Sequence, residues 1–423
     1  MSGWGYKLTS MDPTNHTPNG AATLDAEVVE AVVGVRSAYA DLLAAIPRDS
    51  DGAIGVERAL GVSKKLAWQV YRAATSDNPL SSGARVPGRA AARQVVAAAQ
   101  RVGIDDALAE RINEATERFF ATVDAHADDR SSFDLMVRSV TGEGIEGHDA
   151  ELKRTAYRVN RELVGRCCDV DVYTLLVAPS STPGHMDMCS LRGLHGLRRL
   201  RPDVPLVISR HRFDQGEGNV RAREPVFDEA VEGGPLGLVA EFSTEPMPEI
   251  SAHTGQDGYT RFVARADRLG TSSAVSCYLA DVSRGLPIRT PDGSAAIGHI
   301  HEIGTPARVL YQDMLIDRRL LSESEFGVVS PELRVLSRRL DTTAWPGDDR
   351  GVLLPTEERL VRAGRGAGAL STTELPQYPG MVERTAQRLG VDLDDMVLFR
   401  VRVEHPVLYS VVWVRLDLDG RVG

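Results

Sequence analysis

The hydrophobic pattern changes character near Gly142, and this change constrains the fold more than any other feature. Between residues 23 and 140, apolar residues recur at spacings of three and four, the period of amphipathic helices. After residue 145, short runs rich in β-branched and apolar residues are separated by Gly and Pro, as expected of β-strands. The sequence therefore predicts an α+β protein, with an all-helical domain over 23–140 and a larger mixed α+β domain over 145–423.

Within the N-terminal part, the first 22 residues lack an apolar period and predict a disordered leader over 1–22. The helical pattern then begins at Thr23 and stops at Pro47. Further helices are expected over 54–60 and 64–74, from the loop around Pro87 to about 102, and from Asp105 onward. A chain of 423 residues is long enough for two such domains.

In the C-terminal part, strands and helices do not alternate strictly, which favours a mixed sheet over a doubly wound one. A long surface loop is expected over about 342–368, which is rich in Pro and Gly. Strands are expected over 172–178, 206–209, 238–242, 274–280, 308–316, 396–404 and 407–418, and helices over 151–165, 191–200, 332–340 and 378–389.

Charge and cysteine content exclude several classes of protein. The net charge of −10 argues against a protein that wraps nucleic acid with its whole surface, so any such role must lie in a local patch. Four scattered cysteines without a CxxC pair predict neither a disulfide framework nor a structural zinc site, and a reduced cytoplasm is the expected location. The longest strongly apolar run, 407–414, is too short to span a membrane.

The segment from Val56 to Arg72 has the pattern of two short helices joined by a sharp turn. Gly61 can adopt the turn conformation that a residue with a Cβ resists, and Ser63 can cap the second helix. If 64–74 is helical, one side packs on the preceding helix through Ala67, Val70, Tyr71 and Ala74, against Val56, Ala59 and Leu60. The opposite side then presents Lys64, Lys65, Trp68, Gln69 and Arg72.

This opposite side has the chemistry of DNA recognition. Lys and Arg side chains bind guanine edges or phosphates, and Gln binds adenine. Residues 54–101 hold eight basic and two acidic residues, a local charge of +6 in a chain whose remainder is −16. Arg89 and Arg93, four residues apart, are expected to contact phosphate beside the motif. The candidate DNA-binding residues are therefore Ser63, Lys64, Lys65, Trp68, Gln69, Arg72, Arg89 and Arg93.

The segment 56–72 resembles the helix-turn-helix of bacterial transcription regulators, most clearly in the run Ala-Leu-Gly-Val-Ser that ends at Ser63. The resemblance implies that 63–72 is a recognition helix and that double-stranded DNA is the partner. Glu57 departs from the pattern, because those motifs usually have a small residue there. The alternative interpretation is a helical hairpin used for packing or protein contacts, with its charges in solvent.

Because one such motif reads about half a site, we expect a homodimer. The C-terminal domain is then expected to sense a small-molecule effector or to form the dimer, and no cofactor is predicted. The whole chain resembles bacterial proteins that carry such an N-terminal segment, and this likeness implies no activity.

His299 and His301 support a second hypothesis, an enzyme or metal-binding protein with its site in the C-terminal domain. In an extended segment the two histidines point to one face, as metal ligands can. The spacing resembles the first half of a cupin metal motif, but Thr305 and Pro306 stand where the expected glutamate would be. Histidines at the surface or in the core are therefore the favoured interpretation, and no metal ligand is assigned.

Overall fold

The chain divides into two compact units, Met1–His148 and Asp149–Gly423. The computed structural model describes residues 26–47, 52–76, 78–141, 145–212, 224–227, 230–231, 234–235, 237–256, 259–265, 267–289, 295–321, 330–338, 352–354 and 356–418. The predicted leader over 1–22 lies outside these residues. In the described part, no helix is long and apolar enough to cross a membrane.

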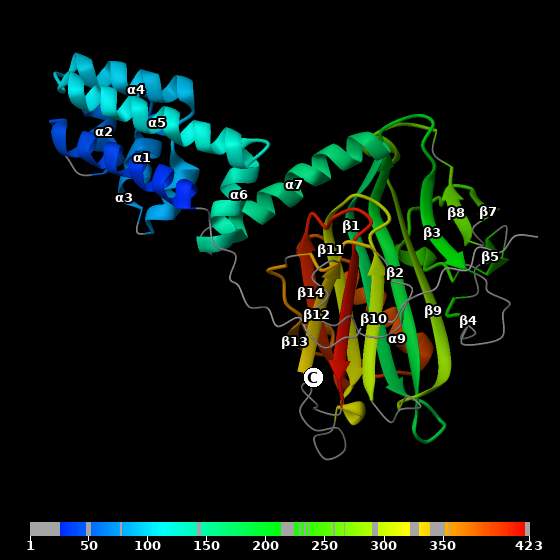
Figure 1. Cartoon of the computed structure of the whole chain (residues 1–423). Coiled ribbons are helices and arrows are strands. Elements are labelled where there is room, and N and C mark those ends of the chain that lie inside the picture. Colours follow the sequence, from blue (N-terminus) through cyan, green and yellow to red (C-terminus); the bar gives the residue numbers. More distant parts are fainter. Residues whose placement is uncertain are drawn as a thin grey trace, which may run out of the picture. The chain divides into compact units, whose positions relative to one another are not determined.

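The N-terminal unit is helical, as the periodicity predicts (Figure 1). Its order is α1 (Ala26–Ala45), α2 (Ala53–Leu60), α3 (Lys64–Thr75), the 3-10 helix η1 (Pro79–Arg85), α4 (Arg89–Arg101), α5 (Asp106–His126) and α6 (Arg130–Thr141). The next helix, α7 (Ile145–Val164), begins before the division between the units and continues into the second.

A single apolar core holds the described helices of this unit together. Tyr39 and Leu42 of α1 are fully buried with Ile112 and Phe119 of α5, and Phe119 meets Phe133 of α6 edge to face at 5.5 Å. Burying each large apolar side chain contributes about 1.5–3 kcal/mol. These contacts fix α1 and α5, on which α2 and α3 depend for their position.

The centre of the C-terminal unit is a seven-stranded sheet in the order β13-β14-β11-β1-β2-β9-β4 (Figure 1). Among its described pairs, β1 and β11 are parallel and the others are antiparallel. The bounds are β1 (Arg166–Pro179), β2 (His185–Arg199), β4 (Glu224–Pro225), β9 (Val275–Pro287), β11 (Ala307–Asp317), β13 (Val361–Arg365) and β14 (Met396–Glu404).

Smaller elements complete this unit. One three-stranded sheet has the order β10 (Ala296–Glu302), β15 (Val411–Asp417) and β12 (Ser330–Leu336), and another has β3 (Leu206–Arg212), β8 (Tyr259–Ala264) and β7 (Ile250–Thr254). The one α-helix described after α7 is α9 (Tyr378–Leu389). The short pieces are β5 (Ala230–Val231), β6 (Gly234–Pro235), η2 (Ala240–Phe242), η3 (Thr271–Ser273), η4 (Arg318–Leu320), η5 (Ala367–Leu370) and η6 (Leu393–Asp395).

Both faces of the large sheet are covered. Side chains alternate along each strand, so neighbouring residues of β1 face different cores. On β1, Val172 and Leu176 share a core with α9, whereas Leu175 and Val177 share a core with β10 and β15. The sequence prediction of an α+β protein, helical first and mixed afterwards, is confirmed.

Three sequence-based predictions are wrong in this unit. Residues 191–200 form most of β2 and residues 332–340 overlap β12, where helices were expected. Of residues 238–242, where a strand was expected, Leu238 forms an isolated β-bridge and Ala240–Phe242 form η2. The strand β13 also lies within the predicted loop 342–368.

The error at 191–200 has a physical cause. Leucines three residues apart indicate a helix, but β2 contains a bulge between Leu194 and Leu197, near Gly196 with φ 63°. Leu191 and Leu197 are six residues apart, so the period-two alternation of a strand also places them on one face, where both are buried.

A buried hydrogen-bond network around an ion pair of the sheet joins α9 to the sheet. Asp313 of β11 is fully buried, and Arg400 of β14 donates to both of its oxygens, at 2.9 Å from Nε and 2.7 Å from Nη2. The Tyr378 hydroxyl of α9 donates to the same carboxylate at 2.6 Å and lies 2.7 Å from the Thr174 hydroxyl. The network satisfies a charge that would otherwise be costly to bury.

Glu374 should make folding stability depend on acid pH. The Tyr311 hydroxyl donates to its carboxylate at 2.7 Å, and with Arg402 this lowers the pKa of Glu374 to about 2. A glutamate has a pKa of about 4.3 in the unfolded chain. A carboxyl whose pKa is lower in the folded state stabilises the fold above that unfolded value, and this stabilisation is lost as the pH falls toward 2. Denaturant unfolding at pH 7, 4 and 3 should show that the free energy of unfolding decreases less in acid for Glu374→Gln than for the wild type. An equal dependence of unfolding free energy on pH in the two proteins would contradict this role of Glu374.

Candidate nucleic-acid interface

The turn between α2 and α3 has the conformation that its sequence predicts. Gly61 ends α2 in the left-handed region, with φ 63° and ψ 32°, and its N–H donates to the Glu57 carbonyl at 2.9 Å. Ser63 is the N-cap of α3, since its hydroxyl accepts the Leu66 N–H at 3.3 Å. The angle between the two helices is therefore set by a short segment whose residue types are locally required.

Gly61→Ala should destabilise the N-terminal unit by about 1–2 kcal/mol. A Cβ at Gly61 would meet no atom within 4 Å, so the cost comes from the left-handed backbone and not from a clash. Gly34 in α1 is the matched control: it is also exposed and open, without the positive φ. Gly34→Ala should stabilise the helix by about 0.5–1 kcal/mol, and thermal unfolding of the two variants checks the opposite signs.

One side of α3 is packed against the rest of the helical unit. Ala67, Val70 and Ala74 are buried in the same core as Val56 and Leu60 of α2. Tyr71 and Ala59 pack at its edge. The predicted buried side of α3 is therefore the one observed, and Glu57, half-buried on α2, does not prevent this packing.

The opposite side of α3 faces solvent within this unit. Lys64, Lys65 and Arg72 are exposed, Gln69 is half-buried, and Trp68 leaves 44% of its surface accessible. Among the described residues, no carboxylate lies within ion-pair distance of Lys64, Lys65 or Arg72. We call Lys64, Lys65, Trp68, Gln69 and Arg72 the α3 flank.

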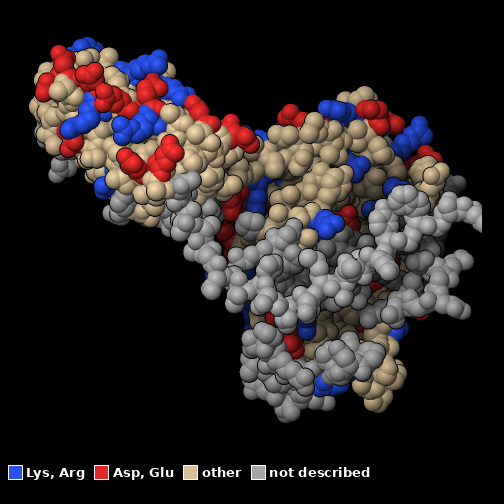
Figure 2. Space-filling model, in the orientation of Figure 1, with Lys and Arg blue, Asp and Glu red and all other residues tan. Residues whose placement is uncertain are grey.

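Arg89 and Arg93 of α4 lie in a different electrostatic setting. Arg89 pairs with Asp124 at 2.7 Å and with Glu117 at 3.4 Å, and Arg93 also pairs with Glu117 at 3.4 Å. In the view of Figure 2, basic and acidic side chains are interspersed over this helical unit. The charge of these two arginines is therefore partly offset by α5, unlike that of the α3 flank.

Arg85 lies beside the α3 flank and was not among the DNA-binding residues that the sequence predicts. Its guanidinium lies 5.1 Å from the centre of the Trp68 ring, because η1 packs beside α3. A 3-10 helix carries little periodic signal, so the direction of this side chain could not be inferred from the sequence.

His299 and His301 do lie on one strand, β10, beside one aromatic ring. The ring of His299 stacks on Tyr173 at 3.6 Å, and His301 Nε2 lies 3.0 Å from Asp171 Oδ2. Asp171 is buried, so the pair joins the large sheet to β10 in the interior. The described residues contain no group of three His, Cys, Asp or Glu side chains that could hold a metal ion. The geometry is that of a buried histidine–carboxylate pair.

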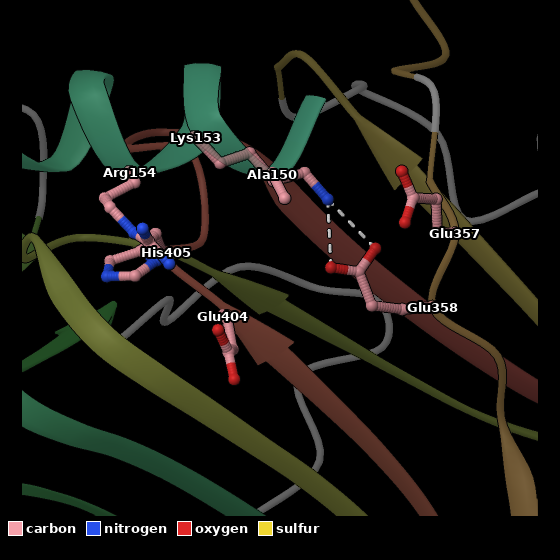
Figure 3. A pocket seen from close by; sticks show the side chains of 7 residues that line it. All are labelled: Ala150, Lys153, Arg154, Glu357, Glu358, Glu404 and His405. Carbon is pink, nitrogen blue, oxygen red and sulfur yellow. Dashed lines mark hydrogen bonds and ion pairs between the residues drawn. The ribbon is translucent and has the colours of Figure 1, made fainter. Parts of the chain in front are cut away.

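A small pocket of the C-terminal unit is lined by α7, by the segment before β13, and by Glu404 and His405 at the end of β14 (Figure 3). Lys153 donates to Glu358 at 2.9 Å across it, and Glu404 and His405 line the other side. Burial and the nearby Arg154 lower the pKa of His405. The Lys153–Glu358 pair joins α7 to the segment that precedes β13, within the C-terminal unit.

The four cysteines are free and buried. Burial raises the pKa of the Cys277 thiol to about 12 and that of Cys168 well above its ordinary value. Thiols in this state are poor nucleophiles. The vicinal pair Cys167 and Cys168 therefore contributes to packing.

Comparison with protein-family models, with curated proteins and with solved structures found no match to this chain. The α3 flank and its surroundings are therefore the features of this chain that point to a function.

Proposed function

We propose that this protein binds double-stranded DNA in a sequence-dependent manner through α2 and α3, acting as a transcription regulator. One observation carries the proposal: a helix fixed by a glycine turn and a serine cap presents Lys64, Lys65 and Gln69 on its outer side. A helix with its side chains is about 10–12 Å across, and the major groove is about 12 Å wide. The α3 flank has the size and chemistry to enter it.

The roles of the side chains follow from their positions along α3. Residues near the start of a recognition helix contact base edges, which assigns Lys64, Lys65 and Gln69 to the bases. Lys bonds to guanine and Gln to adenine. Arg72, one turn further, is assigned to phosphate, and the Ser63 cap orients the helix.

Arg89 and Arg93 are assigned to a supporting position. Because Glu117 and Asp124 already accept their charges, a contact with phosphate would have to compete with existing ion pairs. We therefore expect a smaller contribution to DNA affinity from these two residues than from the α3 flank.

A homodimer is part of the proposal, since one recognition helix covers about half of a two-fold site. The C-terminal unit, with a core of its own, would supply the pairing or the response to a small-molecule effector. Sedimentation of the full chain with and without a two-fold DNA site would reveal a two-to-one complex.

Salt titration of DNA binding tests the function directly. Fluorescence anisotropy of a labelled duplex should show affinity that falls linearly with the logarithm of salt concentration, with a slope near −0.9 for each phosphate contact. Absence of binding to genomic fragments at about 50 mM salt would reject DNA binding. It would leave the helical hairpin as a protein-contact element.

A further inference from the structure

Arg85 is held in place over the α3 flank by an aromatic ring. Its guanidinium lies 5.1 Å from the centre of the Trp68 ring, a cation–π contact. Trp68 in turn keeps 44% of its surface accessible, although a tryptophan of this size usually buries most of its ring. The contact therefore orders a long cationic side chain on a surface that faces solvent within this unit.

The charges of two other arginines also affect the guanidinium group of Arg85. Its guanidinium pKa is lowered, first by partial burial and then by the charges of Arg138 on α6 and Arg72 on α3. Asp134 is the carboxylate that offsets this repulsion, and Asp134 also accepts a hydrogen bond from Arg130 Nε at 2.7 Å. Arg72 follows Trp68 by one turn of α3, so the guanidinium groups of Arg72 and Arg85 lie on the same side of the helix, next to one ring.

Convergence of like charges is unfavourable in the protein alone and becomes favourable when an anion binds between them. Guanidinium groups suit phosphate, since their planar N–H groups match its oxygens. Arg72 and Arg85 lie near the C-terminal part of α3, after Lys64 and Lys65. That is where the phosphate backbone runs when the start of a helix lies in the major groove.

We propose that Arg72 and Arg85 form a phosphate-binding site for the DNA backbone, with Trp68 as the platform that positions Arg85. This inference rests on the proposed DNA binding and adds η1 to the interface. The site contributes affinity for any sequence, whereas Lys65 and Gln69 distinguish one sequence from another.

The test compares full-length wild type, Arg85→Ala, Arg85→Lys and Arg118→Ala on one specific and one random duplex, across a range of salt concentrations. Arg118 is the matched control, an exposed arginine on α5 whose partner is Glu30 of α1. Thermal unfolding of each variant verifies that it folds. Arg85→Ala should weaken binding to both duplexes by the same factor, about eightfold at 0.1 M salt, and reduce the salt slope by about 0.9.

The remaining variants separate charge from position. Arg85→Lys keeps the charge and should retain most of the salt slope, and Arg118→Ala should match the wild type. Wild-type affinity and slope in Arg85→Ala would overturn the phosphate site and leave the proposed DNA binding intact. If wild-type protein bound neither duplex, the proposed function and this site would both be rejected. A loss confined to the specific duplex would also overturn the site, since it would make Arg85 a base-reading residue.

Discussion

Arg400→Ala is expected to destabilise the C-terminal unit by about 3–5 kcal/mol, the usual cost of removing one partner from a buried ion pair. The Asp313 carboxylate has no exposed surface, and Arg400 supplies hydrogen bonds to both of its oxygens. Without Arg400, the Tyr378 hydroxyl would be the principal donor left to a buried negative charge. Unfolding in denaturant, followed by the fluorescence of buried Trp413, measures the loss.

The same variant should respond to pH in a defined direction. Burial raises the pKa of Asp313 above its ordinary value even with Arg400 present, and removal of the arginine should raise it further. A carboxyl with a raised folded pKa binds its proton more readily in the folded state, so stability increases as the pH falls through that pKa. The deficit of Arg400→Ala should therefore be largest at neutral pH and should shrink in acid.

Two controls separate the buried charge from a general loss of packing. Arg384→Ala removes a surface pair with Glu241 and should cost less than about 1 kcal/mol. The double variant Arg400→Met/Asp313→Leu removes both charges and should recover much of the loss. If the loss of unfolding free energy in Arg400→Ala did not depend on pH, the role of the ion pair would be refuted. The same holds if the double variant were as unstable as the single one.

Lys65→Ala and Gln69→Ala should each weaken specific DNA binding by about 1–3 kcal/mol, a factor of roughly 5 to 150. Both side chains belong to the α3 flank, and truncation at Cβ leaves the buried side of the helix unchanged. Binding to random duplex should fall only slightly for Gln69→Ala, which removes no charge. The ratio of specific to random affinity, measured at fixed salt, is the informative quantity.

Arg93→Ala shows how far the interface extends along α4. Because Arg93 is already paired with Glu117, its removal should change affinity less than Lys65→Ala does. If Arg93→Ala lost more affinity than Lys65→Ala, the centre of the interface would lie on α4 and the assignment of the bases to α3 would be wrong.

The helical unit could be predicted from sequence because its signals are local. Gly61, Ser63 and Asp105 act within a few residues of their own position, and they mark helix ends in the structure. The exposed side of α3 follows from the helical period alone. The same reasoning identified α9 and β14, whose patterns are long and uninterrupted.

The C-terminal unit was harder to predict because its partners are distant in the chain. Asp313 and Arg400 are separated by 87 residues, and no spacing in the sequence predicts their contact. Asp171 and His301 are 130 residues apart, so the histidine pair was recognised without its carboxylate. The three-residue spacing of Leu191, Leu194 and Leu197 also led to the prediction of a helix, although these residues lie on β2.

The most direct test of the central claim is genome-wide recovery of DNA bound by the full chain, beside the variant Lys65→Ala/Gln69→Ala. Sequence-dependent binding through the α3 flank predicts that the wild type recovers a limited set of fragments sharing a two-fold sequence, and that the double variant loses this set while its fold is unchanged. Recovery of the same fragments by both proteins, or of none by the wild type, would contradict it.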